Sequence, residues 1–189
     1  NYVEEPYDLS QVLFIATANY LENIPAPLRD RMEIVELSSY TKFEKFQIAK
    51  EHLISRQIEV HGINDKQFKI DDDAIYHIIE NAAKYIAPKT NAKISFRIEK
   101  SDVLVIFEMK SLYIQPGEED EIFNEGYSGE IAKKVDMAGK GIGMYRARRL
   151  IELNNGTITV EPGEFPEKIK NIDYANNRFI ITLPLQKRA

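Results

Sequence analysis

Residues 71–85 read DDDAIYHIIENAAKY, and this stretch decides how the second half of the chain folds. Three leading aspartates suit the N-terminus of a helix, where free backbone N–H groups carry partial positive charge. The apolar residues that follow recur at helical spacing and form one face: Ile75, Ile78, Ile79, Ala82 and Ala83. The pattern predicts an amphipathic helix that ends with NAAKY, residues 81–85.

The residues after this helix predict an antiparallel sheet. Apolar and polar residues alternate over 93–99, which is typical of a strand with one face on a core. After a KSD turn, VLVIF at 103–107 predicts a more buried partner strand. A helix marked by Met144, Ala147, Leu150 and Ile151 follows later, and then TITV (157–160) and FIITLP (179–184) predict the closing strands.

A glycine-rich motif, GKGIGM at residues 139–144, opens that later helix. Its glycines let backbone N–H groups approach a phosphate, and the helix N-terminus adds a positive dipole end. The motif is not the P-loop GxxxxGK[ST], because Lys134 stands at the first glycine position and Gly141 follows the lysine. It is not GxGxxG either, because residue 144 is methionine.

A long polar connection, residues 110–141, precedes the glycine motif. Connections of this length are usually functional or mobile. Its last part, residues 126–139, holds three glycines and few large apolar residues beyond Tyr127, Ile131 and Val135. We call residues 126–139 the lid segment and expect it to be mobile without a ligand.

Taken in order, these elements resemble the ATP-binding domain of sensor histidine kinases, gyrase and heat-shock chaperones, known as the GHKL fold. The order is an asparagine-box helix, a hairpin, Ile122–Phe123, a lid, a glycine box, a helix and two strands. The resemblance covers roughly residues 66–185. It implies a two-layer α/β sandwich that binds ATP and Mg²⁺.

The resemblance also implies which residues form the nucleotide site. Asn81 takes the Mg²⁺ ligand position, which suits the preference of this ion for hard oxygen ligands. Lys84 lies on nearly the same helical face and reaches a phosphate, while Tyr85 offers a flat ring to the purine. The phosphates are expected at Gly139, Lys140, Gly141 and Gly143.

One position departs from the GHKL pattern. These domains usually carry an aspartate just after the second hairpin strand, where it accepts a hydrogen bond from the adenine amino group. Here the strand continues as FEMKS (107–111), with Met109 about where the aspartate should stand. Strand alternation points Glu108 to the opposite face. The missing charge-assisted bond predicts weaker adenine binding by about 1.5–3 kcal/mol.

The first third of the chain has a different character. The continuous apolar run VLFIATA (12–18) predicts a strand buried in a parallel sheet, and MEIVEL (32–37) predicts a second strand. Thr41 and Glu44 form a capping box that predicts a helix of about four turns after it.

The sequence of residues 10–41 together with 44–63 resembles the AAA+ ATPase module of Lon protease, a match that runs over roughly residues 2–80. It implies that Asn19 is a sensor asparagine and Arg31 an arginine finger, with Arg29 as the nearby alternative. The phosphate-binding loop, the Mg²⁺-binding acidic strand and the Ser–Lys protease residues are absent from this sequence. We therefore expect Asn19 and Arg31 to be inert here.

The chain is thus interpreted as a composite of residues 1–65, an incomplete AAA+-like β/helical segment, and residues 66–189, a GHKL-like domain. The two families meet within residues 71–85, where both have a helix with an acidic start. Three origins fit such a composite: an engineered chimera, a natural fusion, or two sequences joined together.

Composition excludes several functional classes. The 25 basic and 30 acidic residues give a net charge of −5, which argues against a general nucleic-acid binder. No cysteine is present, so disulfides and thiolate metal sites are excluded. No apolar run approaches a membrane span, and no leader pattern is seen, so we expect a cytoplasmic protein. His52, His61 and His77 are expected to be structural, and RARR (146–149) to coat a helix face.

The favoured function is Mg-ATP binding by a histidine-kinase-like catalytic domain. The chain lacks a phosphoacceptor helix, so this function implies a partner protein that carries the acceptor histidine. One alternative is a fragment of an ATP-dependent Lon protease, which implies a homo-oligomer. Another is a degenerate, non-catalytic interaction domain.

Overall fold

The computed structural model describes residues 12–18, 21–35, 40–63 and 68–185. The chain divides into two compact units, Asn1–Ser39 and Tyr40–Ala189. No helix within the described ranges is both long and apolar enough to cross a bilayer.

In its described part, the first unit contains only two short helical turns, η1 (Leu21–Asn23) and α1 (Ala26–Arg29). The strand predicted at 12–18 is wrong, since these residues form no strand and Leu13, Phe14 and Ile15 are largely exposed. Residues 32–35 form no strand either, and the end of that predicted strand lies outside the described residues. A buried parallel strand needs paired neighbours and covered faces, which the described part of this unit does not provide.

The second unit begins with a continuous helical stretch that includes a π-helical segment. The stretch consists of α2 (Lys42–Gln47), η2 (Ile48–Ile54) and α3 (Ser55–Val60). The capping box is confirmed: Thr41 accepts from the Glu44 amide, and the Glu44 carboxylate accepts from the Thr41 amide at 2.7 Å.

This helical stretch packs within the second compact unit, which begins at Tyr40, while the division of the chain into segments 1–65 and 66–189 stays a prediction. Its buried Phe46, Ala49 and Ile54 join the main core. Phe46 meets the ring of Tyr76 edge-on, with centroids 5.8 Å apart. The compact unit includes this stretch because the next helix covers its apolar face.

That next helix, α4 (Asp72–Tyr85), has the predicted start and face. The Asp71 carboxylate accepts hydrogen bonds from the amides of Asp73 and Ala74, which caps the N-terminus. Five apolar residues at helical spacing are buried: Ala74, Ile75, Ile78, Ile79 and Ala82. The helix is therefore fixed in rotation, and its other face is directed away from the core.

The sheet is antiparallel and has the order β1–β2–β5–β3, with β4 paired to β5. Its strands are β1 (Lys93–Glu99), β2 (Asp102–Leu112), β3 (Thr157–Glu161), β4 (Glu167–Ile169) and β5 (Ile172–Pro184). The predicted hairpin and both predicted closing strands are confirmed. The short strand β4 was not predicted.

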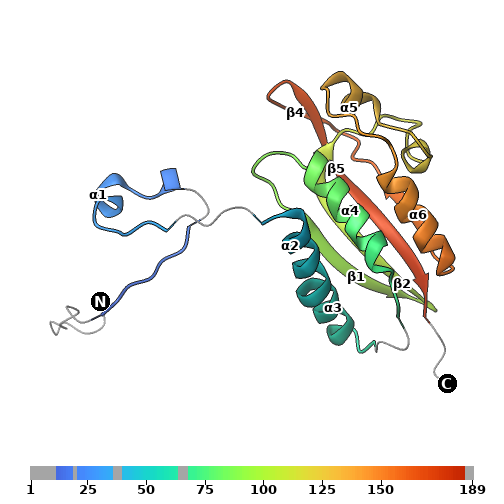
Figure 1. The fold of residues 1–189 in the computed structure, drawn as a ribbon, viewed down its shortest axis with the longest axis horizontal. Coiled ribbons are helices and arrows are strands. Elements are labelled where there is room, and N and C mark those ends of the chain that lie inside the picture. Colours follow the sequence, from blue (N-terminus) through green and yellow to red (C-terminus); the bar gives the residue numbers. More distant parts are fainter. Residues whose placement is uncertain (1–11, 19–20, 36–39, 64–67, 186–189) are drawn as a thin grey trace. The chain divides into compact units, whose positions relative to one another are not determined.

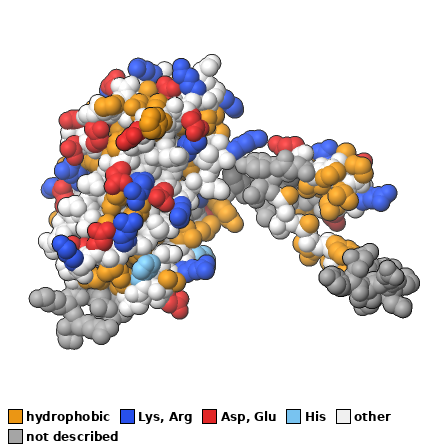
Figure 2. All heavy atoms as spheres, turned by 180° about the vertical axis from the view of Figure 1, so that it is seen from behind, with side chains coloured by type: hydrophobic (Ala, Val, Ile, Leu, Met, Phe, Trp, Pro, Cys, Tyr) orange, Lys and Arg blue, Asp and Glu red, His pale blue; other side chains and the backbone are white. Residues whose placement is uncertain are grey.

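Figure 1 shows α4 and α6 (Gly143–Leu153) on one face of this sheet, with α2 and α3 alongside α4. This is the predicted two-layer α/β sandwich. Alternate residues of β2, such as Val103, Val105 and Phe107, are buried against the helices. The other face carries ion pairs, including Arg178 with Glu108 at 3.2 Å, and Figure 2 shows acidic and basic side chains interspersed there.

The polar connection before α6 contains more regular structure than the sequence pattern indicated, and its mobility without a ligand stays a prediction. It contains the end of β2, the turn η3 (Glu121–Phe123) and the short helix α5 (Glu130–Lys134). A second apolar cluster anchors α5 to the end of the sheet and consists of Ala87, Leu112, Ile131, Ala132 and Tyr174. The lid segment therefore has apolar anchors, because residues distant in sequence cover Ile131 and Ala132.

Two truncations test the position of the unit boundary. We expect a chain of residues 40–189 to unfold cooperatively, with the same free energy of unfolding that the second unit has in the whole chain. Residues 66–189 lose the burial of Phe46, Ala49 and Ile54, and we expect a loss of roughly 3–6 kcal/mol. Urea denaturation followed by circular dichroism measures both. Equal stability of the two truncated chains would contradict the packing of residues 42–60 on α4.

Candidate functional site

A cavity of about 610 Å³ lies in the second unit, where α4, the end of β2, the lid segment and the start of α6 meet. All residues predicted to contact nucleotide line it: Asn81, Lys84, Tyr85, Gly139, Lys140, Gly141 and Gly143. The fold thus brings two motifs that are more than fifty residues apart in sequence to one cavity.

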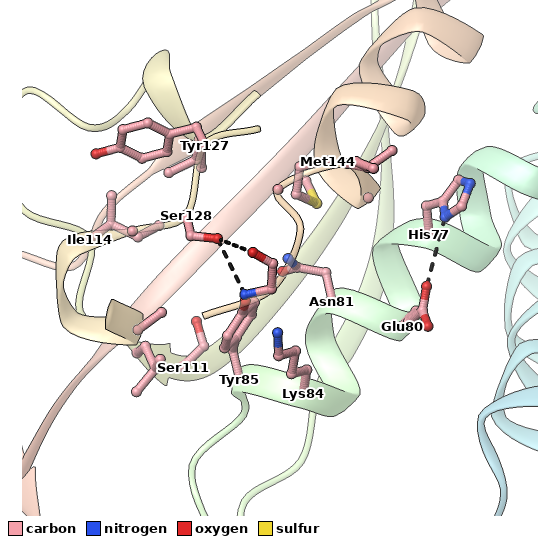
Figure 3. Close-up of a pocket in the computed structure, with 18 of the residues that line it drawn as sticks. His77, Glu80, Asn81, Lys84, Tyr85, Ser111, Ile114, Tyr127, Ser128 and Met144 are labelled. Atoms are coloured by element: carbon pink, nitrogen blue, oxygen red, sulfur yellow. Dashed lines mark hydrogen bonds and ion pairs between the residues drawn. The ribbon is translucent and has the colours of Figure 1, made fainter. Parts of the chain in front are cut away.

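The polar side of α4 forms one wall of the cavity. His77, Asn81 and Tyr85 are spaced four apart and so lie along one stripe of the helix. Figure 3 shows Asn81 and Lys84 directed from α4 toward the cavity, with Tyr85 one turn after Asn81. The Lys84 ammonium lies 4.8 Å from the centre of the Tyr85 ring.

The glycine motif packs closely against the lid segment. The Gly126 amide donates to the carbonyl of Gly141 at 3.1 Å, and the Ser128 hydroxyl donates to the carbonyl of Gly139 at 3.0 Å. Gly141 has φ +67°, and a Cβ there would lie 2.4 Å from the Tyr127 carbonyl oxygen. Only glycine fits this combination of backbone angle and close approach.

Helix α6 presents its N-terminus to the cavity. The helix starts at Gly143 and has no side-chain cap, so its first N–H groups are free to bind a ligand. Residues 141–144 line the cavity. Free amides and the positive end of the helix dipole together form a site suited to phosphate.

The charges around the cavity favour an anion. Glu80 pairs with Lys42 at 3.2 Å, and Arg148 and Arg149, which do not line the cavity, both pair with Glu152. Lys140 and Arg146 also line the cavity, and within the described part of the chain neither has an ion-pair partner. The RARR run is therefore divided, since Arg146 faces the cavity while its neighbours coat the helix.

A buried carboxylate that the sequence pattern did not indicate organises the lid segment. Glu118 is only 6% exposed and accepts three hydrogen bonds. The donors are the amide of Gln115 at 2.7 Å, the hydroxyl of Tyr127 at 2.7 Å and the amide of Glu130 at 2.8 Å. The spacing of residues in the sequence does not indicate these contacts, because the donors lie in a loop, in the lid segment and at the first residue of α5, which only the fold brings together.

A second buried polar group lies at the end of the sheet. Asn177 is fully buried on β5, and its amide nitrogen donates to the Ser111 hydroxyl oxygen at 2.8 Å and to the Leu112 carbonyl at 3.0 Å. Its amide oxygen accepts from the Gly163 N–H at 3.0 Å. Ser111 lines the cavity, so this network is part of the cavity wall.

The interpretation of Met109 is corrected by this geometry. Met109 is 4% exposed, belongs to the main core and does not line the cavity. Two residues later on the same face of β2, Ser111 is the residue that reaches the cavity. Glu108 does point to the opposite face, where it pairs with Arg178. The residue of β2 that lines the cavity therefore lies two positions later than the sequence pattern indicated.

The remaining candidates lie elsewhere or have other partners. Asn19 lies outside the described residues, and Arg31 is exposed in the first unit, after α1. His61 contacts the Gln57 carbonyl at 2.9 Å, and His52 is exposed. His77 lines the cavity, with its Nδ1 3.9 Å from the Glu80 carboxylate.

We expect Gly141→Ala to separate the glycine motif from the lid segment. The left-handed backbone costs alanine about 1–2 kcal/mol, and its Cβ would overlap the backbone of Gly126 and Tyr127. Hydrogen exchange should then become faster over residues 124–141. Gly143→Ala is the matched control, because nothing lies within 4 Å of its Cβ position. Equal exchange in the two variants would contradict the close packing.

Burial raises the pKa of Tyr127 to about 12, and its hydrogen bond to Glu118 adds to this rise. Because the pKa is raised on folding, the bond stabilises the lid segment fully below pH 10 and is lost as pH approaches 12. We expect the ¹³Cζ signal of Tyr127 to stay phenolic until about pH 12, and Glu118→Gln to lower its midpoint. Tyr127→Phe assigns the signal. A midpoint near pH 10 in the unaltered protein would contradict this environment.

The family model described as "Histidine kinase-, DNA gyrase B-, and HSP90-like ATPase" matches residues 71–187. Among solved structures, a mycobacterial sensor histidine kinase, MprB, is similar with a TM-score of 0.50 and 16% identity. That match covers 77% of this chain and 95% of the kinase chain, and it shows the same fold.

Curated relatives are named Lon protease. The Bacillus thuringiensis protein is 33% identical over 176 residues, which is 91% of this chain and 22% of the relative. The Mycoplasma genitalium protein is 60% identical over 80 residues, which is 42% of this chain and 10% of the relative. The chain therefore spans about a tenth to a fifth of the length of these relatives. By the match over residues 71–187, the chain belongs to the family of histidine kinase-, DNA gyrase B- and HSP90-like ATPases.

Proposed function

We propose that the second unit binds Mg-ATP in the cavity between α4 and α6 and serves as a catalytic domain of the histidine-kinase type. The observation that carries this proposal is the meeting of the asparagine-box helix and the glycine motif at one cavity. Membership in the ATPase family supports the same function.

The phosphates are assigned to the end of the cavity formed by the glycine motif. The uncapped N-terminus of α6 supplies backbone donors, and Lys140 and Arg146 supply positive charge. Lys84 approaches the same motif, because its ammonium would lie 2.6 Å from a Cβ placed on Gly139. Phosphoryl transfer depends mainly on positioning and on neutralising charge, which these groups provide.

The residues present fit a magnesium ion that is bound together with phosphates. Mg²⁺ typically uses one or two protein oxygens and completes its shell with water and phosphate oxygens. The Asn81 amide is the oxygen ligand that we assign on this chain. The described residues contain no cluster of three or more His, Cys, Asp or Glu that could hold a metal alone. When bound, the ion would neutralise phosphate charge.

The acceptor of the phosphoryl group is proposed to be a histidine on a partner protein. His77 does line the cavity, but it lies on the same helix as Asn81 and its Nδ1 faces Glu80. No residue of the first unit is needed for the phosphate, metal or base contacts assigned here. The alternative is a Lon-type function, which the 60% identity to a Lon protease over 80 residues favours. That function would require Asn19 and Arg31.

We expect Asn81→Ala to lower the affinity for Mg-ATP at least tenfold and to leave the melting temperature unchanged. The loss should be confined to measurements with Mg²⁺, because the amide acts through the ion. Calorimetry with a non-hydrolysable ATP analogue, with Mg²⁺ or with EDTA, measures both affinities.

Two control variants test whether a loss of affinity is specific to Asn81. Asn91→Ala removes an exposed asparagine that does not line this cavity, and it should bind like the unaltered protein. Arg31→Ala should also leave affinity within about threefold. If Asn81→Ala folds and keeps its affinity, the Mg²⁺ assignment is wrong. If Arg31→Ala abolishes binding, the Lon-like function is correct instead.

A further inference from the structure

Ser111 occupies a built position in the wall of the cavity. It is 4% exposed at the end of β2, and it forms a backbone bridge with Ile86, the residue after Tyr85. Ser111 and the Tyr85 ring therefore belong to the same end of the cavity. Apolar side chains of Leu112, Ile114 and Phe179 line the cavity together with them.

This end suits a nucleobase, and it adjoins the phosphate site, since the Tyr85 hydroxyl lies 3.9 Å from a Cβ placed on Gly139. An aromatic ring and apolar side chains bury a flat heterocycle, whereas the glycine motif and the N-terminus of α6 provide the anion site. Figure 3 shows Ser111 and Tyr85 at a distance from His77 and Glu80 on the preceding turns of α4. Ser111 is then the polar group that meets the edge of the base.

The orientation of the Ser111 hydroxyl is determined by Asn177. The Asn177 oxygen accepts from the Gly163 N–H, so its nitrogen must face β2, where it donates to Ser111 and Leu112. Reversing the amide would break these bonds. One lone pair of the Ser111 oxygen is thereby used, and a proton and a second lone pair remain. Within the described part of the chain, the hydroxyl proton has no acceptor.

We infer that Ser111 makes the cavity accept guanine as well as adenine nucleotides, an inference that rests on the proposed nucleotide binding. A carboxylate only accepts hydrogen bonds, so it selects the adenine amino group and repels the guanine carbonyl oxygen. The Ser111 hydroxyl donates to guanine O6 or adenine N1, and its remaining lone pair accepts from guanine N1–H or the adenine amino group. It therefore matches either edge.

Competition against a fluorescent ADP analogue tests this, with ATP, GTP and CTP in the presence of Mg²⁺. We expect the dissociation constants of ATP and GTP to agree within about threefold, and CTP to bind more weakly because its smaller ring covers less of Tyr85. A ratio below tenfold supports the inference. A preference of tenfold or more for ATP overturns it and leaves the proposed function intact. If no nucleotide binds, the proposed function itself is wrong.

Ser111→Asp tests the same position with an acceptor-only side chain. The carboxylate can still accept from Asn177, and we expect it to favour ATP over GTP by at least tenfold. Ser111→Ala serves as the matched variant, and it should weaken both nucleotides by a similar factor. Melting curves verify that each variant folds. If Ser111→Asp is folded and the ratio does not change, the base does not lie against residue 111 and the inference is wrong.

Discussion

The antiparallel pairing of β2 with β5 is the interaction on which the rest of the second unit depends. It joins Asp102–Leu112 to Tyr174–Pro184 without interruption, in the middle of the sheet. Because side chains alternate along both strands, one face is apolar, while the other combines ion-paired side chains with apolar ones such as the buried Ile106. The apolar face packs against α4 and α6, and the opposite face carries ion pairs such as Arg178 with Glu108. Both motifs of the cavity are positioned by those two helices.

The cavity lies between α4, β2 and α6, and its remaining wall is irregular backbone that buried polar side chains hold in place. Glu118 satisfies two amides and a tyrosine hydroxyl, and Asn177 satisfies an amide and a carbonyl. Buried backbone groups outside helices and strands need such partners, since an unpaired donor is costly away from water. These two side chains therefore determine where the lid segment and the end of β2 lie relative to α4.

Two interpretations from the sequence were wrong for an identifiable physical reason. The apolar run at 12–18 has the composition of a buried strand, but a strand of that kind exists only with paired neighbours. Met109 was assigned to the cavity by counting along a motif. It has the same parity as Ser111, so strand alternation alone could not decide which of the two lies at the cavity.

The sequence by itself determined the helix at 72–85, the hairpin after it, the capping box at Thr41 and the two motifs that line the cavity. Those features depend on local spacing, on helix capping and on strand alternation, all of which are visible in consecutive residues. Only the tertiary structure decided that residues 42–60 pack on α4, that Glu118 anchors the lid segment, and that Ser111 and Asn177 meet. Each of these contacts joins residues far apart in the chain or in irregular backbone, and their energies arise only when the folded sheet excludes water from both partners.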